Sequence, residues 1–105
     1  MLIIIMKKLT EQEIKNELEN LDGWEFTGKS IRKTFSVKSF ALNMALVSGI
    51  GSICEQFDHH PDYMLVKYST LEVAFSTHDA NGITEKDFNN AREIEAFWDV
   101  FSKTE

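Results

Sequence analysis

The only proline of this chain, Pro61, separates a long apolar helical pattern from two strand-like segments. Apolar residues recur at helical spacing over 40–57, and Ser39 just before them is typical of a helix N-cap. A proline disfavours the helical conformation of the residue that precedes it. We therefore predict a helix over 40–57 that stops near Asp58, with His60 extended.

Two glycines, Gly49 and Gly51, fall inside this predicted helix. Glycine lowers helix propensity, so its presence in a helix interior needs a packing reason. The apolar face of the helix is wide, which indicates a central or sandwiched position. We expect the two glycines to let the helix approach a sheet closely.

The remaining patterns predict the other elements. They indicate a helix over 11–20, a strand hairpin over 24–27 and 30–37, two strands over 63–68 and 71–77, and a last helix that begins at a capping box over 84–87. The order α-β-β-α-β-β-α predicts an α+β fold. We expect a four-stranded antiparallel sheet with three helices packed on one face.

The length of 105 residues indicates one domain, which we place at 9–105, with 1–8 as an N-terminal extension. The net charge of -6 argues against direct nucleic-acid binding and against docking on anionic membranes. Cys54 is the only cysteine, so no intrachain disulfide can form, and a reducing cytoplasm is the expected setting.

The apolar start of the chain, 1–6, is too short for a transmembrane helix and lacks the features of a signal peptide. Three interpretations remain for it: an added strand, an oligomer contact, or a start-codon assignment in which Met6 is the true first residue. The last is favoured.

All three histidines lie in one short region, next to several carboxylates: His59, His60 and His78 with Glu55, Asp58 and Asp79. Histidine is the side chain whose unperturbed pKa lies nearest neutral pH. If the strands over 63–68 and 71–77 form a hairpin, their far ends meet. The two histidine segments would then share one small cavity, where proton transfer is the expected chemistry.

Three interpretations of the histidines are open. They are a polar helix end, a metal site, or a metal-free acid–base site. Adjacent residues do not project to one side, so His59 and His60 are poorly placed to bind the same ion, and no established metal-binding spacing is present. Asp87 also fits a helix cap, and Cys54 fits the apolar stripe of its helix better than a nucleophile.

The spaced polar residues resemble the signature of the pterin-4a-carbinolamine dehydratases. The matching positions are Glu55, His59-His60-Pro61, Tyr68, Ser76-Thr77-His78-Asp79, Gly82 and Asp87. The resemblance spans about residues 9–97, and the family has the same order of helices and strands. Tyr63 stands where many relatives carry another aromatic residue, often Trp.

This resemblance implies a reaction in which a 4a-hydroxytetrahydropterin loses water to give a quinonoid dihydropterin, with no metal or organic cofactor. It implies that His59 and His78 are the acid–base pair and that His60 helps to bind and polarise the pterin. Asp58 and Asp79 would hold imidazole tautomers and bind the pterin. The other expected substrate-binding residues are Glu55, Pro61, Ser76, Thr77 and Asp87.

The resemblance also implies assembly as a homodimer or homotetramer. Animal members serve as dimerisation cofactors of a transcription factor, so a non-catalytic partner-protein role is the alternative function. An enzyme acting on another pterin, such as one of molybdenum cofactor metabolism, is a further alternative that the same residues would serve.

Overall fold

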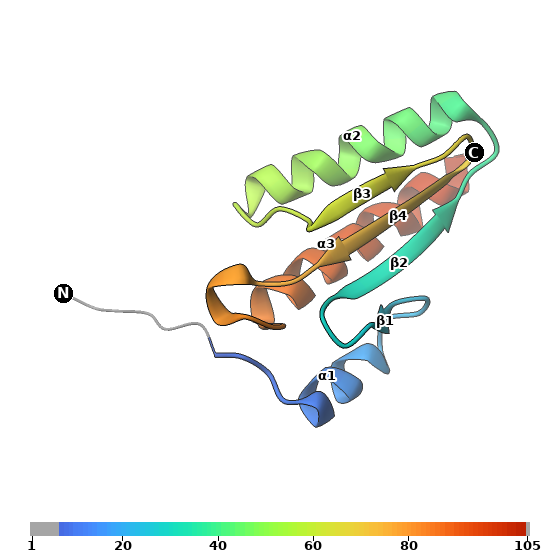
Figure 1. Ribbon diagram of the computed structural model, residues 1–105. Coiled ribbons are helices and arrows are strands. Elements are labelled where there is room, and N and C mark those ends of the chain that lie inside the picture. Colours follow the sequence, from blue (N-terminus) through green and yellow to red (C-terminus); the bar gives the residue numbers. More distant parts are fainter. Residues whose placement is uncertain (1–6, 105) are drawn as a thin grey trace.

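The computed structural model of the protein describes residues 7–104, so most of the predicted extension lies outside the described residues. The elements follow the predicted order (Figure 1): α1 (Glu11–Leu18), β1 (Glu25–Phe26), β2 (Ile31–Ser36), α2 (Phe40–Gln56), β3 (Tyr63–Val66), β4 (Thr70–Phe75) and α3 (Glu85–Phe101). Two short 3-10 turns, His78–Ala80 and Ser102–Thr104, were not predicted.

The four strands form one antiparallel sheet in the order β1-β2-β4-β3. The longest pairing joins β2 to β4, with Ile31 opposite Phe75 and Phe35 opposite Leu71. These four side chains are buried. The side chains of Arg32, Thr34 and Glu72 alternate with them and point to the other face, as the period of two along a strand requires.

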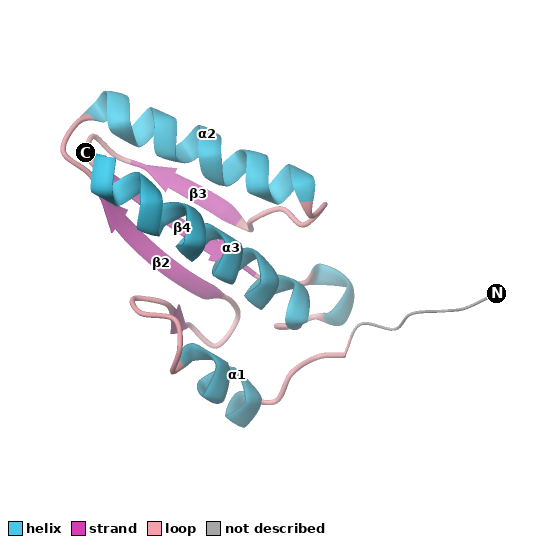
Figure 2. Cartoon of the chain, turned by 180° about the vertical axis from the view of Figure 1, so that it is seen from behind, coloured by secondary structure: helices cyan, strands magenta, loops and turns pink. Residues whose placement is uncertain are grey.

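The helices cover one face of this sheet, and α1 lies beside the short β1 (Figure 2). The predicted α+β architecture is therefore confirmed. The core between the layers draws on all three helices and on β2 and β4: Ile14, Leu21, Trp24, Ile31, Phe35, Val37, Leu46, Ile50, Cys54, Leu71, Val73, Phe75, Ile83, Phe88, Ala91 and Ile94. Among the described residues, no helix combines the length and apolarity needed to cross a membrane.

The two glycines of α2 do not act as expected. A Cβ added at Gly49 would come within 2.3 Å of the Phe97 ring, so this glycine allows α2 to approach α3 and not the sheet. A Cβ added at Gly51 would meet nothing within 4 Å among the described residues beyond its own stretch of helix, so no close approach explains this glycine. The prediction was wrong because the wide apolar face of α2 indicates that other elements pack against this helix, but it does not indicate which ones.

Both long helices begin at side-chain caps. The Thr84 hydroxyl accepts from the Lys86 N–H, and Asp87 at the third helical position accepts from the Thr84 N–H at 2.9 Å, which completes the predicted capping box of α3. Ser39 caps α2 in the same way, through the Leu42 N–H. The capping box of α3, bonded to Thr77, fixes the start of this helix next to the end of β4, where the candidate site lies.

Candidate active site

The chain turns sharply where α2 gives way to β3. The last helical residue is Gln56, and Asp58 adopts a left-handed conformation with φ of 49°. Aspartate is one of the few residues with a side chain that enters this region readily. The His59 N–H then donates to the Cys54 carbonyl at 3.1 Å, so the corner stays attached to the end of the helix. The helix ends within two residues of the predicted position.

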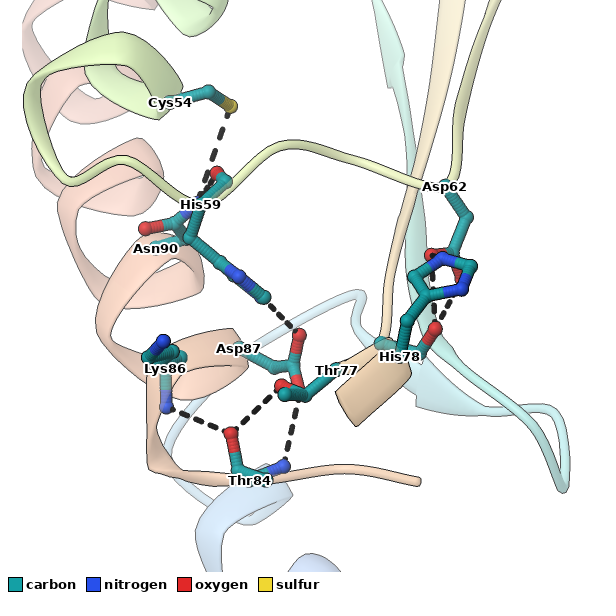
Figure 3. A network of polar contacts seen from close by, with 10 residues as sticks. Cys54, His59, Asp62, Thr77, His78, Thr84, Lys86, Asp87 and Asn90 are labelled. Atoms are coloured by element: carbon teal, nitrogen blue, oxygen red, sulfur yellow. Dashed lines mark hydrogen bonds and ion pairs between the residues drawn. The ribbon is translucent and has the colours of Figure 1, made fainter. Parts of the chain in front are cut away.

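The hairpin of β3 and β4 brings this corner to the end of β4. The Asp62 N–H donates to the Ala74 carbonyl at 2.7 Å, and Thr77 pairs with Gly82 just beyond β4. A cavity of about 410 Å³ lies between the two segments, lined by Asp58, His59, His60, Pro61, Ser76, Thr77, His78, Asp79 and Lys86. All of these except Lys86 belong to the site predicted from the sequence. Figure 3 shows His59 on the first segment and Thr77 and His78 on the second.

His59 is held by a fully buried carboxylate. Its Nε2 lies 2.6 Å from Oδ1 of Asp87, which has no exposed surface. The other oxygen of Asp87 accepts from the Thr77 hydroxyl at 2.8 Å and from the Thr84 N–H at 2.9 Å. The His59 ring also stacks near Phe75. Asp87 is therefore both the helix cap that the sequence indicated and the partner of an imidazole.

His60 and His78 have partners that are more open to solvent. Nε2 of His60 lies 2.5 Å from Oε1 of Glu55, and both side chains are more than half exposed. Nε2 of His78, whose side chain is 85% exposed, lies 3.3 Å from Oδ1 of Asp62. The Ser76 hydroxyl donates to the Asp62 carboxylate. Each of the three imidazoles thus has a carboxylate at its Nε2.

These imidazole partners differ from the expected ones. Asp58 and Asp79 line the cavity, but within residues 7–104 neither makes a hydrogen bond or ion pair with an imidazole. Glu55, Asp62 and Asp87 take that place instead. The left-handed backbone at Asp58 explains why this residue does not meet an imidazole, because it directs the chain away from the axis of α2.

Sequence reasoning missed Asp62 and Lys86. Asp62 follows Pro61 directly, and the register of the β3–β4 hairpin, extended by one residue, places it opposite Phe75 and next to Ser76, so an explicit register would have found it. Lys86 precedes Asp87 in the capping box, and its proximity to the cavity follows only from how α3 packs. Tyr68, part of the family-like pattern, lies beyond the far end of β3 and stacks on Phe40, away from the cavity.

A larger cavity of about 760 Å³ adjoins the site on the other side of His78. It shares Asp62, Ser76, Thr77 and His78 with the histidine region. The segment before α1 forms its other wall, where the Leu9 N–H donates to the Ile83 carbonyl at 2.8 Å and the side chain of Lys8 lies across Gly82. His78 therefore borders both hollows, whereas His59 and His60 line only the smaller one.

Cys54 is next to the site but takes no part in it chemically. Its side chain is buried in the core, and burial raises the pKa of the thiol to about 11. A thiol reacts as a nucleophile through its thiolate. At neutral pH Cys54 is a packing residue, as its place on the apolar stripe indicated.

Comparison with known proteins gives one consistent family. Residues 7–97 match the family described as pterin 4 alpha carbinolamine dehydratase. A predicted pterin-4-alpha-carbinolamine dehydratase of Aquifex aeolicus is 43% identical over 91 residues, which cover 87% of this chain and 91% of that protein. One from Sulfolobus acidocaldarius is 40% identical over 87 residues, covering 83% of this chain and 94% of that protein.

Solved structures agree with the sequence matches. The crystal structure of a transcriptional coactivator/pterin dehydratase from Brucella melitensis superposes with a TM-score of 0.80 at 34% identity, covering 86% of this chain and 97% of that one. A pterin dehydratase-like RuBisCO assembly factor of the alpha-carboxysome shares the fold alone, with a TM-score of 0.58 at 15% identity, over 70% of this chain and 83% of that one. With a family match over most of its length and relatives above 40% identity, the chain belongs to the pterin-4-alpha-carbinolamine dehydratase family.

Proposed function

We propose that the protein removes water from a 4a-hydroxytetrahydropterin to give a quinonoid dihydropterin, a step in the recycling of tetrahydropterin. The observation that carries this proposal is the set of three imidazoles at one cavity, each with a carboxylate at its Nε2. Family membership supports a pterin as the substrate class.

The reaction needs two proton transfers and no redox partner. The bond between C4a and the hydroxyl oxygen breaks, and hydroxide leaves as water only if it receives a proton. N5 gives up a proton, and its electron pair forms the double bond between N5 and C4a. One acid and one base are therefore sufficient, and imidazole can serve as either near neutral pH.

The carboxylates orient the rings for these roles. Because each carboxylate faces Nε2, Nδ1 of each ring is the nitrogen left for exchange with a substrate. We assign the acid–base pair to His59 and His78, which come from the two segments that the hairpin brings together. His60, on the more exposed pair with Glu55, binds and polarises the pterin.

The remaining site residues divide into two groups. Asp58, Pro61, Ser76 and Asp79 line the cavity and are proposed to contact the pterin directly. Asp87 has no exposed surface, so it acts through the His59 ring, and the Thr77 hydroxyl supports Asp87 from within the same buried network. Glu55 acts through His60.

A direct assay tests the proposal. Purified protein is mixed with chemically generated 4a-hydroxytetrahydropterin at neutral pH, with a chelator present, and formation of the quinonoid product is followed by absorbance. His59→Ala and His78→Ala should each lower kcat by about 10²–10⁴-fold. Circular dichroism should show that both variants remain folded. Full activity in the double variant would refute the assignment.

Assays with the same purified protein distinguish dehydration from the two alternative functions. Activity only on a differently substituted pterin would point to another branch of pterin metabolism. A specific partner protein that is retained equally by wild type and by a variant lacking all three histidines, with no dehydration by either, would favour a non-catalytic role.

We propose further that the protein is a homodimer or homotetramer. β3 is an edge strand of the sheet, and it exposes Tyr63, Leu65 and Val66 by 42%, 46% and 39%. An open, apolar edge strand is a surface that proteins usually cover. Light scattering coupled to size exclusion gives the mass directly, and Leu65→Lys should shift it towards the monomer. A monomeric wild type would contradict this proposal.

A further inference from the structure

Asn90 holds the backbone of the same histidine whose ring Asp87 holds. The Nδ2 amide of Asn90 donates to the His59 carbonyl at 2.6 Å, and Asn90 is fully buried (Figure 3). Asp87 and Asn90 are three residues apart on α3, so they lie on the same face of the helix. One face of α3 thus contacts both the ring and the main chain of His59.

His59 is attached at three points as a result. Its N–H donates to the Cys54 carbonyl on α2, its carbonyl accepts from Asn90 on α3, and its ring meets Asp87. The residue before it, Asp58, is in a left-handed conformation, which an aspartate adopts more readily than most residues and which these bonds hold in place. Asn90 is the group that joins this corner to α3 through the main chain.

Packing alone does not explain an asparagine at position 90, because a buried amide group without hydrogen-bond partners lowers the stability of the fold. Its Oδ1 is buried and has no hydrogen-bond partner within residues 7–104, although Nδ2 also lies 4.0 Å from the Cys54 sulfur. A buried carbonyl oxygen without a partner costs stability. The short hydrogen bond of the Asn90 amide is the one to the His59 carbonyl, and the Cys54 sulfur is a second, more distant acceptor.

From this geometry we propose that Asn90 is a positioning residue for His59, which fixes the imidazole at the cavity for proton transfer. The proposal rests on the dehydration proposed above. Asn90 does not line the cavity and acts only through the histidine. A misplacement of a catalytic group by about 1 Å can cost about 100-fold in rate, so loss of this bond should be visible in turnover.

The test compares Asn90→Leu with Asn43→Leu. Asn43 is an equally buried asparagine whose Nδ2 donates to the Lys67 and Thr70 carbonyls at 2.7 and 2.8 Å. Its Oδ1 also has no partner among the described residues. It lies at the opposite end of the β3–β4 hairpin, so its replacement removes two buried amide–carbonyl bonds without touching the site.

Asn90→Leu should lower kcat about 10- to 100-fold and change KM by less than about threefold, because the lost bond does not reach the substrate. The imidazole ¹⁵N signals of His59 should move or broaden, and the pH profile of kcat should change. Asn43→Leu should keep kcat within about twofold of wild type and leave the His59 signals in place. Asn90→Ala replaces Asn90→Leu if the leucine variant does not fold.

Two outcomes would overturn the inference. One is an Asn90 variant whose kcat and pH profile equal those of Asn43→Leu. The other is an Asn90 variant whose His59 signals equal those of wild type. If wild-type protein shows no dehydration, the proposed function is lost, and the His59 signals still decide whether Asn90 positions this ring.

Discussion

Oδ1 of Asp87 lies 2.6 Å from Nε2 of His59, inside a capping box that starts α3. The same carboxylate therefore sets the position of a helix and the orientation of an imidazole. This double use explains how a histidine at a loop corner, with a side chain that is only 11% exposed, can be fixed rigidly: its partner belongs to the first turn of a helix that is packed into the core.

Replacement of Asp87 by asparagine should separate these two uses. Asp87→Asn keeps an oxygen that can accept from the Thr84 N–H, but it removes the charge beside His59. We expect kcat to fall about 10²–10⁴-fold and the free energy of unfolding to fall by about 1 kcal/mol. Stopped-flow kinetics and urea denaturation measure the two effects.

Glu13→Gln is the matched control for Asp87→Asn. Glu13 closes the same kind of capping box at α1, and the hydrogen bond from the Thr10 N–H lowers the pKa of its carboxyl. This variant should weaken the α1 cap and leave kcat unchanged. Equal kcat values for Glu13→Gln and Asp87→Asn would mean that the Asp87 carboxylate serves only the helix.

His78 should depend on Asp62 in a milder way. The Asp62→Asn variant removes the charge 3.3 Å from His78 Nε2, while its amide oxygen can still accept from the Ser76 hydroxyl. We expect kcat to fall about tenfold, with little change in stability because exposed ion pairs contribute only up to about 1 kcal/mol. Steady-state kinetics provide the measurement.

Glu25→Gln gives the comparison for Asp62→Asn. It breaks an exposed ion pair with Arg32 on the open face of the sheet, and neither residue lines the histidine cavity. Its kinetics should match wild type. If Asp62→Asn is as active as Glu25→Gln, the Asp62 carboxylate has no role in the reaction.

The two glycines of α2 should respond in opposite directions to alanine. Gly49→Ala forces a methyl group against the Phe97 ring and should cost about 1–3 kcal/mol. Gly51→Ala adds a methyl group in open space and should stabilise the helix by up to about 1 kcal/mol. Thermal and urea unfolding of both variants decide this, and a Gly49→Ala variant as stable as wild type would contradict the close approach of α2 to α3.

Alkaline pH should destabilise the fold through Cys54. Burial raises the pKa of this thiol from its ordinary 9.0 to about 11, so the folded protein retains a proton that the unfolded chain releases above pH 9. This stabilising contribution is complete below pH 9 and is lost as the pH rises to 11. The expected slope is at most about 1.4 kcal/mol per pH unit.

The measurement is urea denaturation from pH 8.5 to 10.5 in a Tyr63→Phe background. That background is needed because the hydrogen bond between Tyr63 and Glu72 raises the pKa of the phenol and adds its own alkaline dependence. Cys54→Ala should flatten the pH dependence. If both proteins lose stability equally over this range, the Cys54 thiol is not the group responsible.

The fold could be predicted because each element carries its own local signal. Capping boxes mark the starts of α1 and α3, Pro61 marks the end of α2, and alternation marks β2 and β4. The strand order β1-β2-β4-β3 and the packing partner of Gly49 have no such local signal. They depend on which apolar faces meet, and several arrangements satisfy the same pattern.

The candidate site, too, has features that the sequence predicts and features that depend on tertiary contacts. The sequence alone determined that every histidine lies beside Pro61 or just after β4, because these positions follow from local helix and strand limits. Only the tertiary structure decided their partners: Asp87 for His59, Glu55 for His60 and Asp62 for His78. Hydrogen bonds reach about 3 Å, so a turn such as that at Asp58 changes which carboxylate meets which ring. A sequence pattern brings residues to one region of a fold, but contacts of that length are settled by the turn after α2, the pairing of β3 with β4 and the packing of α3 against the corner.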